Sequence, residues 1–140
     1  MTAYSNRDRE LLIELAAATR QQTSHSAPVS VLVQKLHVFH KAVDTESRDK
    51  EQSSAAEVVV AIVRAAAAFG IAVPELLDCP DVGAVNVLSE LCVAAFEEDR
   101  NRAVGALRKT LDFVRDMCID DDLFSSTLPN LLATKTAENV

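Results

Sequence analysis

Apolar residues recur every three or four positions through most of the chain, which is the spacing of helices that bury one face. A first helix is predicted to begin near Ser5, with Asp8 as its capping partner, and to fade into the polar segment 21–26. Pro28 suits the first turn of a second helix, in which apolar residues continue at helical spacing to Val43. Two amphipathic helices are therefore expected in the first third of the chain.

The third predicted helix is apolar on almost every side. Ser54 and Glu57 have the spacing of a capping box at its start, and Gly70 can close it in the left-handed conformation. The polar segment 44–53 before it is either a loop or a solvated extension of the second helix, and we expect it to be partly helical. A helix that is apolar all round is normally buried, so this one is predicted to be central. Glu57 and Arg64 interrupt its apolar run, which argues against a membrane span.

More helices are predicted in the second half of the chain. We expect one helical turn at 74–77, a fourth helix capped by Asp81, and a fifth that carries apolar residues at helical spacing over 104–118. The charged stretch 97–102 lacks Gly and Pro, so it predicts either a tight corner or one long bent helix. A short tail helix, interrupted at Pro129, completes the pattern.

Composition favours the same all-α fold. Three Gly and four Pro in 140 residues are too few for the many turns of an all-β domain. The length suits one domain, and 49% hydrophobic residues supply its core. We therefore predict a compact bundle of five to six helices over residues 1–134, with 135–140 as a frayed tail.

The charge balance argues against nucleic acid as a partner. The chain has 21 acidic and 14 basic residues, a net charge of −7, whereas proteins that bind phosphate backbones usually present a basic stripe. Ala66 and Gly70 have the spacing of a helix-turn-helix motif, but segment 73–80 after them contains neither Lys nor Arg. DNA reading is not expected there.

Cysteine usage and the N-terminus predict a cytoplasmic protein. Cys79, Cys92 and Cys118 are odd in number and far apart, so we expect buried, reduced thiols. The charged segment 7–10 is unlike the apolar run of a signal peptide.

Candidates for metal binding and catalysis are sparse. His37 and His40 have a spacing that could share a metal ion, but no third ligand accompanies them. The run 120–122 does not match a calcium loop, and the sequence contains no glycine-rich phosphate loop. We expect no metal, no cofactor and no catalytic residue, and we predict that the chain is not an enzyme.

Two segments are candidate surfaces for a protein partner. Segment 120–132 mixes acidic and bulky apolar residues, as do short helices that dock into hydrophobic grooves, although packing onto its own bundle is the simpler alternative. The fifth helix concentrates the basic residues Arg100, Arg102, Arg108, Lys109 and Arg115, and Asp112 and Asp116 are expected to pair with this set at i, i+3 and i, i+4. This indicates a neutral, solvent-facing helix or a patch for an acidic partner. The candidate partner-binding residues are Asp120, Asp121, Asp122, Leu123, Phe124, Leu128, Leu131, Leu132, Arg108 and Arg115.

These observations favour a non-catalytic, intracellular protein-protein interaction or regulatory protein. A small acidic inhibitor, an adaptor or an immunity-type module would fit, binding another protein or a second copy of itself as a homodimer. The first alternative is a helical nucleic-acid-associated or viral assembly protein, and the second is a metal-dependent enzyme.

Overall fold

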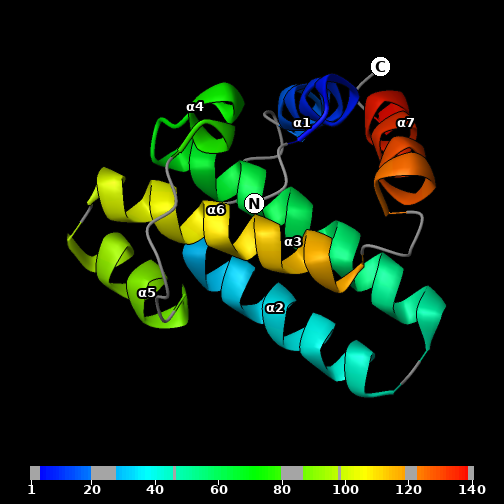
Figure 1. Cartoon of the computed structure of the whole chain (residues 1–140), viewed down its shortest axis with the longest axis horizontal. Coiled ribbons are helices and arrows are strands. Elements are labelled where there is room, and N and C mark those ends of the chain that lie inside the picture. The colour runs from blue at the N-terminus through cyan, green and yellow to red at the C-terminus, as the bar shows by residue number, and fades with distance from the viewer. Residues whose placement is uncertain are drawn as a thin grey trace.

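The computed structural model describes residues 4–19, 28–45, 47–79, 87–97, 99–118 and 123–138. Over these residues the chain folds into helices and no strands, as predicted, and the helices form a bundle (Figure 1). Its elements are α1 (Asn6–Thr19), α2 (Pro28–Asp44), α3 (Arg48–Ala68), α4 (Val73–Leu77), α5 (Val87–Glu97), α6 (Arg100–Met117), the π-helical turn η1 (Leu123–Thr127) and α7 (Leu128–Glu138).

Helix α3 is the central element, which confirms the prediction from its apolar sequence. Its side chains Val58, Ile62 and Ala65 are fully buried, and it contacts α1, α2, α4, α6 and η1. Figure 1 shows α2, α3 and α6 lying side by side along the long axis of the molecule. In the part of the chain that the structure describes, no helix combines the length and apolar character needed to cross a membrane.

The predicted capping box at Ser54 is wrong, because α3 begins two turns earlier, at Arg48. Ser54 lies inside the helix, where its hydroxyl donates to the carbonyl oxygens of Lys50, at 2.6 Å, and Glu51, at 3.1 Å. The polar first turns can be helical because they are largely exposed, and Asp49 and Glu51 there oppose the positive end of the helix dipole. Part of 44–53 is helical, as expected, but residues 48–53 belong to the start of α3 and do not extend α2, which ends at Asp44.

Gly70 ends α3 as predicted, with a φ of 73°. The Ile71 amide donates to the Ala66 carbonyl at 2.8 Å, which satisfies one of the last carbonyls of the helix. Helix α4 follows and buries Val73, Leu76 and Leu77. The element after the turn therefore contributes a five-residue helix to the core and has no exposed basic face for DNA.

The charged stretch between α5 and α6 forms a corner, which decides between the two predicted alternatives. Asp99 is the N-cap of α6, and its Oδ1 accepts a hydrogen bond from the Arg102 amide at 3.2 Å. The predicted cap of the preceding helix, Asp81, lies outside the described residues, and α5 is described from Val87.

The tail helix exists, but Pro129 does not interrupt it. Pro129 is the second residue of α7, and the π-helical turn η1 leads directly into it, so the helical geometry changes next to the proline but the helix does not end there. Helix α7 contacts α1 and continues to Glu138, into the segment expected to fray.

The cysteines differ from one another in exposure. Cys118 is buried as predicted and Cys79 is partly buried, but Cys92 on α5 is exposed. That prediction failed because Cys92 lies on the outer side of α5, away from the fully buried Leu91 and Ala94. None of the three forms a disulfide with another described residue.

Candidate functional site

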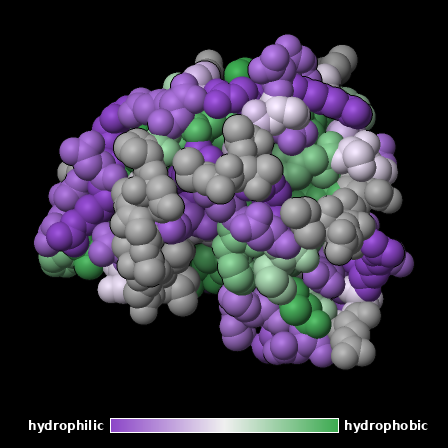
Figure 2. Space-filling model, viewed as in Figure 1, coloured by the Kyte–Doolittle hydropathy of each residue, from purple (hydrophilic) through white to green (hydrophobic). Residues whose placement is uncertain are grey.

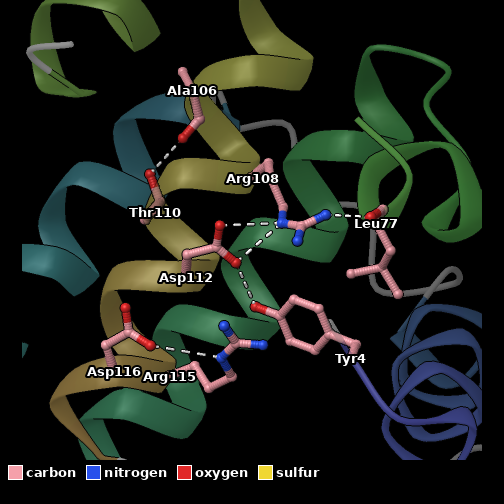
Figure 3. Close-up of polar contacts among 8 residues, drawn as sticks. All are labelled: Tyr4, Leu77, Ala106, Arg108, Thr110, Asp112, Arg115 and Asp116. Carbon is pink, nitrogen blue, oxygen red and sulfur yellow. Dashed lines mark hydrogen bonds and ion pairs between the residues drawn. The ribbon is translucent and has the colours of Figure 1, made fainter. Parts of the chain in front are cut away.

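Helix α6 carries an ion pair, between a buried arginine and a partly exposed aspartate, that joins three parts of the chain (Figure 3). Arg108 lies four residues before Asp112, and its Nε donates to both carboxylate oxygens, at 3.0 and 3.1 Å. The Arg108 Nη1 donates to the Leu77 carbonyl oxygen at the end of α4. This pair therefore fixes α4 against α6.

Tyr4 brings the N-terminal segment to the same carboxylate. Its hydroxyl donates to Asp112 Oδ1 at 2.9 Å, and its ring lies below the guanidinium of Arg115, with 4.2 Å between Cζ and the ring centroid. The ring also contacts Phe124 of η1, at 6.1 Å between centroids. We call Tyr4, Arg108, Asp112 and Arg115 the Tyr4 cluster.

Burial dominates the acid–base chemistry of the Tyr4 cluster. Burial raises the pKa of the Tyr4 hydroxyl well above its ordinary value, and the Asp112 charge raises it further, against the lowering effect of Arg115 and Arg108. Burial also raises the pKa of the nearby Cys79 thiol. Both groups are held in their protonated forms at neutral pH, so neither is activated as a nucleophile.

The predicted pairing of Arg108 with Asp112 is confirmed, but the expected exposure of Arg108 is wrong. The side chain of Arg108 is buried because α4 and the N-terminal segment cover it. Arg115 Nε lies 3.7 Å from Asp116, and its side chain is only 14% exposed. Partner binding by Arg108 and Arg115 stays a prediction, and the contacts described here give both a role in the fold.

The C-terminal candidate residues that the structure describes also pack within the fold. Leu123 and Leu128 are buried in the core of their own chain, and Phe124, Leu131 and Leu132 pack partly buried against it. This agrees with the alternative in which the segment packs onto its own bundle. Asp120, Asp121 and Asp122 lie outside the described residues.

Exposed aromatic and apolar side chains gather instead where α2 lies beside α6. The Phe113 ring lies 5.6 Å from the His40 ring and meets the buried Phe39 edge-on at 6.3 Å. Phe113 is 39% exposed and Met117, one turn further along α6, is 41% exposed. Figure 2 shows hydrophobic side chains at the surface in the middle of this view, over α2 and α6. We call His40, Phe113 and Met117 the α2–α6 face.

On α6, a basic residue precedes Phe113 and an acidic residue follows it. Lys109 precedes Phe113 by one turn and is partly exposed, and Asp116 follows it with 65% of its side chain exposed. Phe96, the most exposed large apolar residue described, is 91% exposed at the end of α5. Phe96 is not part of the face. It lies near Arg100, the first residue of α6, and the helical rise from Arg100 to Phe113 is about 20 Å.

Two open grooves accompany the face. One, of about 550 Å³, lies between α2 and α3 and includes Val38, Lys41 and Lys50. The other, of about 670 Å³, lies between α1 and α7 and includes Arg7, Glu14 and the candidate residue Leu132.

In the described ranges, no three His, Cys, Asp or Glu side chains come together as they would around a metal ion. Comparison with protein families, with characterised proteins and with solved structures found no match. Function is therefore inferred from the chain's own residues.

Phe113, Met117 and Tyr4 were not among the residues singled out from the sequence. Phe113 lies about 100° around α6 from Val114, outside the apolar stripe that predicts the buried side. A bulky apolar residue off the stripe, repeated one turn later by Met117, is the signal that would have pointed to this face. Tyr4 precedes the first helix, and no spacing rule connects it to Asp112.

Proposed function

We propose that the protein is a non-catalytic protein-binding module that recognises its partner through the α2–α6 face. The exposure of Phe113 and Met117 beside the His40 ring is the observation that carries this proposal. Aromatic residues and Met are enriched at the centres of protein interfaces, and an aromatic ring buries much area with little loss of conformational entropy.

The Tyr4 cluster supports the same function by contrast, because its polar groups are used in contacts within the chain. The ionisable groups of the Tyr4 cluster bond to one another and to the Leu77 carbonyl oxygen, which leaves them a role in holding the fold. The α2–α6 face has no such internal use for its exposed area. A cytoplasmic location is part of this proposal, and it is supported by three cysteines that form no disulfide among the described residues.

Site-specific photo-crosslinking tests this function. Phe113 is replaced by the photoreactive p-benzoylphenylalanine, and the same replacement of Phe96 is the control, since it is aromatic and more exposed but lies outside the face. We expect protein adducts from position 113, in the purified protein or in an extract of the native source, that an excess of unlabelled wild-type chain competes away. Adducts no more frequent from position 113 than from 96, in both settings, would overturn the proposal.

A further inference from the structure

We propose that the α2–α6 face joins two copies of this chain, with their α6 helices antiparallel across a two-fold axis near Phe113. This inference rests on the proposed function, because it names the partner of the same face. The argument comes from the order of charges along α6 and from the exposure of its apolar residues.

Symmetry determines which residues would meet. When two identical helices cross antiparallel at Phe113, a residue one turn before the crossing faces a residue one turn after it in the other copy. Lys109 lies four residues before Phe113, and Asp116 and Met117 lie three and four residues after it. Lys109 of each copy would therefore face Asp116 of the other.

This arrangement places apolar contact at the centre and opposite charges on both sides. The two Phe113 rings and the two Met117 side chains would cover each other, and two symmetric Lys109–Asp116 pairs would flank them. Asp116 is accessible for this contact, since its side chain is 65% exposed and its pair with Arg115 is long, at 3.7 Å. Charge pairs at the rim of an interface fix register and partner choice more than they add affinity.

The order of the charges favours a second copy over other protein partners. A basic partner would be matched by acidic residues on both sides of the apolar centre, and an acidic partner by basic residues on both sides. A cation before the centre and an anion after it form the pattern that complements itself when the helix is reversed. Like-charge contacts would oppose the parallel arrangement.

Charge reversal tests the register directly. Sedimentation of the wild-type chain over a concentration series is expected to show a monomer–dimer equilibrium. Lys109→Glu places two acidic residues opposite each other, and Asp116→Lys places two basic ones. Each variant alone should weaken dimerisation about tenfold, which is the effect expected for two altered surface ion pairs. Mixing the two variants restores both pairs, so the mixture should form a heterodimer near wild-type affinity.

A matched control uses Lys41→Glu, which makes the same charge change on α2 but in the groove toward α3. It should leave dimerisation close to that of the wild type. Recovery in the mixture also shows that both variants fold. A wild-type chain that stays monomeric at its highest soluble concentration overturns the inference, as does a dimer that Lys109→Glu weakens no more than Lys41→Glu. If position 113 crosslinks only to a different protein, this inference fails while the proposed function stands.

Discussion

At the residue scale, the Asp112 carboxylate holds together parts of the chain that are far apart in sequence. It accepts hydrogen bonds from Tyr4 and Arg108, and Arg108 in turn reaches the Leu77 carbonyl oxygen. In the described part of the chain, every buried side-chain nitrogen and oxygen has a hydrogen-bond partner. Removal of the Asp112 carboxylate would leave the buried Arg108 charge without its counter-ion.

Asp112→Ala is expected to lower the free energy of unfolding by about 2–4 kcal/mol, since removing one partner of a buried ion pair leaves the other charge uncompensated. Urea denaturation followed by circular dichroism measures this. The double variant Arg108→Met/Asp112→Leu is the control, because it removes both charges and keeps apolar volume. It should be more stable than Asp112→Ala, and equal or lower stability would contradict the role assigned to the pair.

Tyr4 predicts a stability change at alkaline pH. Its pKa is raised in the folded protein, so above the ordinary tyrosine pKa of about 10 the unfolded chain releases this proton while the folded chain keeps it. The stabilisation is complete below that value and is lost progressively as pH rises above it, toward the raised pKa of the folded protein. Relative to Tyr4→Phe, the wild type should lose about 1.4 kcal/mol per pH unit above pH 10.

Denaturation at several pH values between 9 and about 11.5 measures this difference. Tyr4 is the only tyrosine, so its ionisation can also be followed directly by ultraviolet absorbance. Parallel pH profiles of the two proteins would show that the hydroxyl titrates alike in the folded and unfolded chains, against this expectation.

At the scale of elements, the N-caps of α3 and α6 differ in what they contribute. Asp99 accepts from the Arg102 amide at the start of α6, whereas Ser47 at the start of α3 makes no side-chain cap hydrogen bond. The difference matters most for α6, because the corner at Asp99 sets where the helix of the α2–α6 face begins.

Asp99→Ala is expected to reduce the free energy of unfolding by about 1 kcal/mol, as the loss of an N-cap side chain commonly does. Ser47→Ala serves as the comparison and should change it by less than about 0.5 kcal/mol. Thermal and urea denaturation of both variants give the two values. A larger effect at Ser47 than at Asp99 would mean that the caps are assigned the wrong way round.

At the scale of the whole molecule, the C-terminal segment belongs to the bundle. Leu123 and Leu128 are buried in the same core as Leu12 and Leu15 of α1, and α7 contacts α1. The Leu-x-x-Leu-Leu pattern at 128–132 therefore has its first leucine inside the fold.

Leu128→Ala should destabilise the protein by about 2–5 kcal/mol, because the side chain is fully buried and its removal leaves a cavity. Leu132→Ala, at a partly buried position, should cost less. Chemical denaturation compares the two variants. If Leu128→Ala changed stability no more than Leu132→Ala, a groove-binding role for this leucine would regain support.

Local chemistry in the sequence determined the helices and several of their ends. The helix ends at Ser5, Pro28 and Gly70 could be predicted, because each depends on contacts or conformations within a few residues of that position. The spacing of apolar residues likewise identified α3 as the central helix. The start of α3 could not be predicted, because Ser54 has a capping spacing that the helical continuation of 48–53 overrides.

Only the tertiary structure decided which side chains are covered. Arg108 and Phe113 both lie on α6, yet the charged residue is buried and part of the aromatic one is exposed. The physical reason is that burial depends on neighbours distant in sequence. Leu77 and Tyr4 cover Arg108, and the spacing of apolar residues along α6 does not predict which residues of other helices lie next to Phe113. The α2–α6 face exists because the fold brings the Phe113 ring of α6 to the His40 ring of α2.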